Sequence, residues 1–305
     1  MKVTLIHNPD AGSDDLTCGE EPVELIRRAG HQLVYQSSKD SDWKSALLKP
    51  ADLVAVAGGD GIVGTVAELM IGRGTPIAVL PLGTANNIAK TLNLMDFSLA
   101  QLINGWSTAS HRKFDSGVAN GPWGSAHFVE GLGIGLFTEM MTRLDARGNL
   151  DLAHLTEPEE KVTSVLEMLQ ARLKTCPEIK LHVTVDGRDL SGEYILLEVM
   201  NIKSIGPNLF LAPAADPGDG LFDVVCLTRG AQETLSRCLE ECKEGSQAPT
   251  GLPVRKGKQI HIEWEGTPIH IDDQAWPESG ANFPPSLTVI DITVEPQSLE
   301  FMTPG

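Results

Sequence analysis

Apolar runs that end in glycine-bearing turns recur through the first third of the chain. Residues 52–57 are almost continuously apolar, which is typical of a strand buried on both faces of a parallel sheet. The strand leads into residues 58–61, Gly-Gly-Asp-Gly, and a helical pattern follows over 63–70. Further apolar strands are predicted at 3–6, 31–35 and 76–80, and helices at 20–29 and 85–92. Strands alternating with helices predict an α/β fold with a doubly wound parallel sheet.

The pattern changes after about residue 110. Helical periodicity persists only at 158–173 and 231–242, and the remaining patterns are strands at 114–118, 127–136, 179–185, 194–201, 222–227, 260–264, 269–272 and 287–294. Strands joined by turns predict a mostly antiparallel, β-rich second domain. We expect one domain over residues 1–115 and another over 116–305, and the last residues, about 15, could return to the first domain.

Composition restricts the partners of the protein. The 305 residues carry a formal net charge of −17, which repels nucleic acid and anionic surfaces at long range, so no nucleic-acid partner is expected. The odd number of scattered cysteines, 5, is typical of a reducing compartment and predicts a cytoplasmic protein. No apolar run reaches the ~20 residues of a membrane span, so any membrane contact would be peripheral. A homodimer is compatible with this composition.

The turn after the third strand is a candidate phosphate site. Gly58, Gly59 and Gly61 can adopt positive φ and carry no Cβ, so backbone N–H groups can approach phosphate oxygens at the start of a helix. Asp60 is suited to hold Mg²⁺ or to accept a proton from an attacking hydroxyl. The alternative is a tight structural turn with a solvated aspartate.

Two further turns follow the same plan. Residues 81–87 read Pro-Leu-Gly-Thr-Ala-Asn-Asn, and we expect Thr84 to cap the next helix while Asn86 and Asn87 face the same crevice. Residues 8–12, Asn-Pro-Asp-Ala-Gly, end the first strand. The carboxyl ends of parallel strands meet at one edge of a sheet, where open α/β folds bind ligands. The turns are therefore expected to form one phosphate-binding site.

Taken in order, the motifs at 8–12, 58–61 and 81–87 resemble the signature of the diacylglycerol kinase catalytic domain, a family that includes bacterial lipid kinases and sphingosine kinases. The resemblance continues through 114–117 and through the Ala-Pro and Asp-Gly segment at 211–223. It thus covers nearly the whole chain. The glycine turn by itself is also similar to that of NAD kinases and phosphofructokinases.

The resemblance implies an ATP site, with the strand-two hydroxyl of the family falling on Ser37 or Ser38. The nucleotide-binding residues that it implies are Asn8, Pro9, Asp10, Ala11, Gly12, Ser38, Gly58, Gly59, Asp60, Gly61, Gly83, Thr84 and Asn86. It also implies a structural Mg²⁺ held by the Asp219 carboxylate and the main-chain oxygens of Asp216 and Leu221. The alternative for Asp219-Gly220 is an ordinary hairpin turn.

The chain departs from the family where chemistry is expected. The late Asp-Gly-Glu motif, whose glutamate is the general base in bacterial members, corresponds here to Asp272-Asp273-Gln274. Because glutamine cannot accept a proton at neutral pH, Asp272, Asp273 or Asp60 is expected to act as the catalytic base. The chain could also bind nucleotide or lipid without efficient turnover.

The resemblance therefore implies an ATP- and Mg²⁺-dependent lipid kinase. It would transfer the γ-phosphoryl group to a lipid hydroxyl, such as that of diacylglycerol or a sphingoid base, at a membrane surface. The first domain would bind ATP, and the lipid would enter between the domains. Met140, Met141, Leu144 and residues 209–211 could line an apolar lipid pocket, although such residues are more often core. The alternatives are a kinase of a soluble substrate, as NAD kinases are, and a regulatory binding protein.

Overall fold

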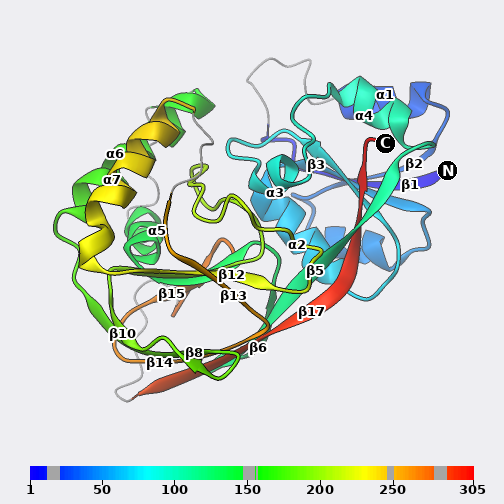
Figure 1. Ribbon diagram of the computed structural model, residues 1–305. Coiled ribbons are helices and arrows are strands. Elements are labelled where there is room, and N and C mark those ends of the chain that lie inside the picture. The colour runs from blue at the N-terminus through cyan, green and yellow to red at the C-terminus, as the bar shows by residue number, and fades with distance from the viewer. Residues whose placement is uncertain (12–20, 147–154, 156, 246–250, 278–286) are drawn as a thin grey trace. The chain divides into compact units, whose positions relative to one another are not determined.

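The computed structural model describes residues 1–11, 21–146, 155, 157–245, 251–277 and 287–305, and these form two compact units. Unit 1 comprises Met1–Asp115 with Pro296–Gly305, and unit 2 comprises Ser116–Glu295. Figure 1 shows the elements of each. Strands β5 (Ser110–Gly121) and β17 (Thr288–Thr303) contribute residues to both units.

Unit 1 is built on a parallel sheet in the order β4-β3-β1-β2, and β17 joins β4 at Phe301 and Ile77. The strands are β1 (Lys2–His7), β2 (Gln32–Ser37), β3 (Leu53–Gly58) and β4 (Ile77–Pro81). Every residue of β3 is buried, as its apolar run predicts for the centre of a parallel sheet. All of these strands run in one direction, so the turns that follow them lie at one edge.

The helices of unit 1 connect these strands. They are α1 (Glu21–Arg28), α2 (Asp60–Met70), α3 (Asn87–Thr91) and α4 (Leu99–Gly105), and a short 3₁₀ helix, η1 (Trp43–Leu48), precedes β3. Helix α2 packs Val63, Val66, Ala67 and Met70 into the core, as their spacing predicts. Helix α4 was not predicted, although a capping box between Ser98 and Gln101 marks its start.

Unit 2 contains two largely antiparallel sheets. One has the order β10-β8-β14-β17, and β9 lies on β8 while β6 pairs with β5; the other has the order β13-β12-β11-β7-β15-β16. The strands not yet located are β6 (Gly124–Phe128), β7 (Gly131–Gly135), β8 (Ile179–Val185), β9 (Arg188–Asp189), β10 (Gly192–Tyr194), β11 (Leu196–Met200), β12 (Phe222–Leu227), β13 (Val254–Gly257), β14 (Gln259–Trp264), β15 (Ile269–Ile271) and β16 (Gln274–Trp276).

The two hydrophobic clusters of unit 2 lie on opposite faces of the second sheet. One packs side chains of both sheets together, among them Phe128, Leu197, Phe222 and Ile262. The other joins the second sheet to the helices α5 (Leu136–Ala146), α6 (Pro158–Leu173) and α7 (Gln232–Lys243), and η2 (Arg229–Ala231) precedes α7. Figure 1 shows these helices gathered on one side of unit 2. The predicted fold class, a parallel α/β sheet followed by a β-rich antiparallel domain, is confirmed.

Helix α5 lies where the sequence analysis extended a strand to residue 136, because the apolar run of β7 continues into the helix without a polar break. The residues suggested for a lipid pocket fall in the helix-covered core. Met140 and Leu209 are buried there, and Met141 and Leu144 pack against it. Among the helices of the described ranges, none is long and apolar enough to cross a membrane.

Candidate active site

The predicted strand-end turns lie side by side at one edge of the unit 1 sheet. The amide of Asn8 donates to the carbonyl of Ala57 (2.9 Å), which joins the first turn to the end of β3. The amide of Leu82 donates to the carbonyl of Gly58 (3.0 Å), which joins the glycine turn to the turn after β4. Ser38 is tied to this edge by its amide, which donates to the carbonyl of His7 (2.8 Å). The structure therefore brings the four predicted segments together.

The glycine turns touch through their backbones. A Cβ on Gly83 would lie 2.2 Å from the Cα of Gly59, and a Cβ on Gly59 would lie 3.0 Å from the Cα of Gly83. A Cβ on Gly58 would lie 2.4 Å from a methyl carbon of Ile62. None of these glycines has a positive φ. They are needed here because the backbones approach closely, and the predicted freedom to adopt positive φ is not used.

Asn86, not Thr84, is the N-cap of helix α3, so the predicted cap was wrong. The Asn86 side chain closes the turn on itself: its Oδ1 accepts from the Gly83 amide (3.0 Å) and its Nδ2 donates to the Gly83 carbonyl (2.7 Å). Asn86 can do this because it adopts a left-handed conformation with φ 54°, which asparagine tolerates. Thr84 is exposed at the tip of the same turn.

Asp60 links the two glycine turns. It is the first residue of α2, and its Oδ1 accepts from the Ile88 amide (3.1 Å) at the start of α3. Burial raises the pKa of Asp60, and the backbone amides of α3 and the charge of Lys90 oppose that rise. Burial lowers the pKa of Lys90, while Asp60 raises it. The carboxylate thus holds the second turn in place, a role that the sequence analysis did not foresee.

The first turn is closed by Asn8. The Asn8 side chain accepts from the Asp10 amide (3.2 Å), and its carbonyl accepts from the Ala11 amide (3.1 Å). Pro9 and Asp10 are exposed, and Asp10 forms an ion pair with Lys39, next to Ser38. Gly12 lies outside the described residues. The described part of this turn therefore faces outward beside the glycine turn.

The arrangement around Asp219 does not fit the expected Mg²⁺ site. Its Oδ1 accepts from the Leu221 amide (2.9 Å) and its Oδ2 pairs with the Lys256 ammonium (2.7 Å). Lys256 also lies 3.4 Å from the carboxylate of Asp223, its cross-strand neighbour in β12. The main-chain oxygen of Asp216 accepts from the Asp219 amide (3.2 Å). Across the described ranges, no group of three or more His, Cys, Asp or Glu residues is placed to hold a metal ion.

The Asp272-Asp273 pair forms the tip of the β15–β16 hairpin. Both carboxylate oxygens of Asp272 are engaged by backbone amides: Oδ2 accepts from Val129 (2.9 Å), and Oδ1 accepts from Glu130 (2.8 Å) and Gly131 (3.0 Å). Burial raises the pKa of Asp272 to about 6 against these hydrogen bonds. Asp273 is exposed. Asp272 therefore fastens the hairpin tip to the segment before β7, and Asp273 faces outward.

Behind this hairpin lies a buried acid–base pair that the sequence analysis missed. Glu198 of β11 and His270 of β15 are 0% and 1% exposed, and their Oε2 and Nε2 atoms lie 2.9 Å apart. The other ring nitrogen of His270 lies 3.0 Å from the main-chain oxygen of Asp272. A signal was available in the sequence, because Glu198 is the one charged residue in the otherwise apolar run 195–200.

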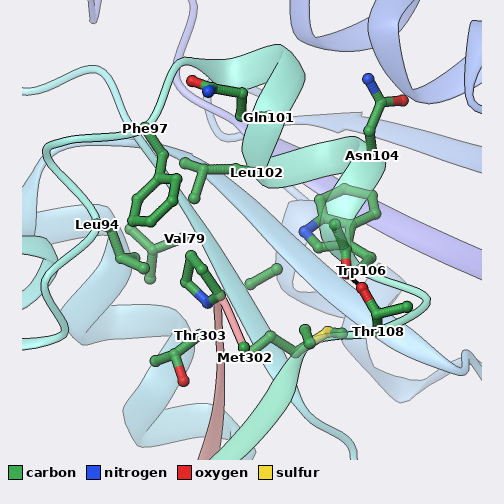
Figure 2. Close-up of a pocket in the computed structure, with 15 residues that line it drawn as sticks. Val79, Leu94, Phe97, Gln101, Leu102, Asn104, Trp106, Thr108, Met302 and Thr303 are labelled. Atoms are coloured by element: carbon green, nitrogen blue, oxygen red, sulfur yellow. Dashed lines mark hydrogen bonds between the residues drawn. The ribbon is translucent and has the colours of Figure 1, made fainter.

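Unit 1 also contains an open cavity of about 440 Å³ with largely apolar walls. Figure 2 shows Phe97, Leu102 and Met302 among the side chains around it. None of the predicted nucleotide-binding residues lines it. This cavity is therefore separate from the strand-end turns.

Both parts of the chain match known families. Residues 2–119 match the family described as the diacylglycerol kinase catalytic domain. Residues 140–303 match the family described as the YegS C-terminal NAD kinase beta sandwich-like domain. The resemblance expected from the motifs is confirmed.

Individual relatives agree with these matches. A Pseudomonas aeruginosa protein assigned as a YegS-like lipid kinase is 30% identical over 240 residues, which are 74% of this chain and 72% of the relative. A diacylglycerol kinase of Mycobacterium tuberculosis is 23% identical and covers 89% of this chain and 88% of its own length. A crystal structure from Bacillus anthracis, assigned as a diacylglycerol kinase, has a TM-score of 0.73 at 22% identity and covers 99% and 97% of the two chains. At this identity, the similarity to the Bacillus anthracis structure shows that the two chains share a fold.

Proposed function

Because this chain belongs to the diacylglycerol kinase catalytic-domain family, with a YegS-like C-terminal domain, we propose that it transfers the γ-phosphoryl group of ATP to a lipid hydroxyl. The observation that carries the proposal is the meeting of the strand-end turns in unit 1, where Gly59 and Gly83 approach too closely for any other residue. Diacylglycerol or a sphingoid base is the acceptor that we propose, at a membrane surface contacted peripherally.

The ATP phosphates are proposed to lie along the strand-end turns. Support comes from the partly exposed glycines Gly59 and Gly83, which carry no side chain, and from the start of helix α2 directly after Gly59. Mg²⁺ would neutralise the phosphate charge when it is bound with ATP, and Asp60 is the acidic residue of the glycine turn at 58–61. The geometry gives Asp60 a further role, since its carboxylate orders α3 through the Ile88 amide.

The acceptor hydroxyl must lose a proton as it is phosphorylated. We propose Asp273 as the base, because it is an exposed carboxylate at a hairpin tip that Asp272 fastens to the segment before β7. Asp272 has two engaged oxygens, which favours a role in holding the tip. Gln274, in place of the family glutamate, begins β16 and is exposed.

A second candidate function is the binding of nucleotide or lipid without turnover. Gln274 favours it, because the residue that stands at the expected base position cannot accept a proton at neutral pH. A soluble acceptor such as NAD is the other alternative, and the description of the C-terminal family as NAD kinase-like supports it. The experiment must therefore distinguish acceptors as well as activity.

Purified protein with Mg²⁺ and γ-labelled ATP would be incubated with vesicles containing diacylglycerol, with vesicles containing a sphingoid base, and with NAD. We expect label in a lipid and none in NAD. Asp60→Asn keeps an oxygen that can accept from the Ile88 amide but removes the charge, so it should retain the fold and lose transfer. ATP binding without transfer to any acceptor would support the binding protein, and labelled NAD would exclude the lipid assignment.

A further inference from the structure

The buried pair Glu198 and His270 is arranged across a glycine. Strand β7 lies between β11 and β15, and Gly133 is the register partner of both Glu198 and His270. A Cβ on Gly133 would lie 2.0 Å from Oε2 of Glu198. The glycine therefore leaves the space in which two side chains from non-adjacent strands meet.

The surroundings of the pair fix the orientation of the imidazole. Phe137 of α5 meets the His270 ring edge-on, with ring centroids 5.1 Å apart and planes at 77°. Nδ1 of His270 lies 3.0 Å from the Asp272 carbonyl oxygen, which has no proton to give, so Nδ1 must carry a hydrogen and donate it. Nε2 then faces Glu198, and one proton is shared between the imidazole and the carboxyl group.

The charges of the pair balance within the core. Burial raises the pKa of Glu198, and His270 opposes that rise. Burial alone would lower the pKa of His270, but Glu198 and Asp272 together outweigh burial and the pKa is raised. Whether the shared proton lies on nitrogen or oxygen, the pair has no net charge and Nδ1 keeps its hydrogen. The donor toward Asp272 is thus present in either arrangement.

We propose that Glu198 and His270 are positioning residues for the Asp272-Asp273 turn. The Nδ1–H group of His270 donates to the Asp272 carbonyl, while the Asp272 side chain accepts from the amides of residues 129–131. Asp272 has φ 48°, a left-handed turn conformation that aspartate tolerates. Asp272 is thereby held at both its carbonyl and its side chain, and this sets the direction of the carboxylate of Asp273, the next residue. This inference rests on the proposed role of Asp273 in the kinase reaction.

The test replaces the pair as a whole, because removal of one partner would leave the other buried and unpaired. The double variant Glu198→Leu with His270→Phe should fold with a Tm close to that of the wild type and keep its KM for ATP. Its kcat for lipid phosphorylation should fall by about 10-fold to 100-fold, because the turn is no longer fixed. Glu198→Gln should stay within about threefold of the wild type, since an amide can donate to Nε2 and preserve the imidazole orientation.

Met200→Leu, at a buried position of the same strand, is the matched control and should leave kcat unchanged. A stable double variant with wild-type kcat would overturn the proposal. An independent readout is the ring of His270 in ¹⁵N NMR, assigned by the loss of its signals in the double variant. A slowly exchanging Nδ1–H is expected in the wild type, and a deprotonated Nδ1 would overturn the proposal even if the kinase is active. If no acceptor is phosphorylated but Nδ1–H persists, the kinase assignment fails and the fixed turn stands.

Discussion

Gly83 lies so close to Gly59 that a Cβ added to it would be only 2.2 Å from the Gly59 Cα. The two glycine turns of unit 1 are therefore in backbone contact. Adjacent strands bring their ends together, and the missing side chains let the turns close. The proposed phosphate site depends on this contact, because one turn sets the position of the other.

Gly83→Ala should separate these turns. The added methyl group meets backbone, which cannot rotate away, so we expect a loss of about 1–3 kcal/mol in the free energy of unfolding and at least about tenfold weaker ATP binding. Denaturant unfolding and calorimetric titration with ATP measure the two effects. Gly105→Ala is the matched control, since a Cβ there has nothing within 4 Å and both properties should persist. Wild-type ATP affinity in Gly83→Ala would show that the contact does not shape the site.

Substitutions should distinguish the roles of the two hairpin aspartates, Asp272 and Asp273. Asp272→Asn places an amide donor against backbone amide donors, so we expect it to lower both turnover and the free energy of unfolding, the latter by about 1–3 kcal/mol. Asp273→Asn should lower kcat by about 10² or more while Tm and ATP affinity stay unchanged. Steady-state kinetics and thermal unfolding of both variants decide the matter. Full turnover in Asp273→Asn would remove that residue from the mechanism.

The ion pair of Lys256 with Asp219 leads to a prediction about how metal ions affect the thermal stability of this turn. Its ammonium supplies a positive charge between the carboxylates of Asp219 and Asp223. The Asp223 side chain is only 3% exposed. Chelators should therefore leave the wild-type Tm unchanged. Lys256→Met should lower the Tm, because the two carboxylates lose their cation, and millimolar Mg²⁺ should partly restore it.

Lys258→Met removes an exposed lysine from the same chain segment and serves as the control. A wild-type Tm that falls on chelation would show that the turn binds a metal in spite of Lys256. Thermal unfolding without ATP keeps this test apart from any metal that accompanies the nucleotide.

His261 gives stability a dependence on pH. Its Nδ1 lies 2.7 Å from Asp291 and its Nε2 lies 3.3 Å from Glu263, and the hydrogen bond to Asp291 raises the pKa of His261 above 6.5 against partial burial. The folded-state pKa is the higher one, so the stabilisation is present below the unfolded pKa and is lost as pH rises through the folded pKa. His261→Gln should thus lower the Tm more at about pH 6 than at about pH 9.

His182→Gln, at an exposed histidine of the neighbouring strand β8, provides the comparison. A Tm difference between wild type and His261→Gln that is the same at both pH values would contradict the assignment of this pair.

The sequence predicted the parts of the fold that rest on local patterns. The strand at 52–57 and the apolar face of α2 follow from apolar periodicity, and both lie within a residue or two of their predicted places. The meeting of the strand-end turns was predictable because parallel strands present their carboxyl ends at one edge. The contact between Gly59 and Gly83 was not, since no local pattern reports how near two backbones come.

Three of the carboxylate contacts that were not predicted depend on residues distant in sequence. Lys256 meets Asp219 only because β13 pairs with β12, and His270 meets Glu198 only because a glycine of β7 lies between them. The Asp60 carboxylate is drawn to α3 by amides that belong to a different turn. The sequence motifs singled out these aspartates as candidate site residues. The hydrogen-bond partners of their carboxylates are set by the tertiary structure.

The central claim is that the nucleotide turns of unit 1 serve phosphorylation of a lipid. One reaction mixture containing Mg²⁺, γ-labelled ATP, vesicles with diacylglycerol and a sphingoid base, and NAD lets the acceptors compete directly, with mass spectrometry to identify the labelled product. The account predicts label on the lipid hydroxyl, and loss of that label in Gly83→Ala with retention in Gly105→Ala. Label on NAD, or label that remains on ATP throughout, would contradict it.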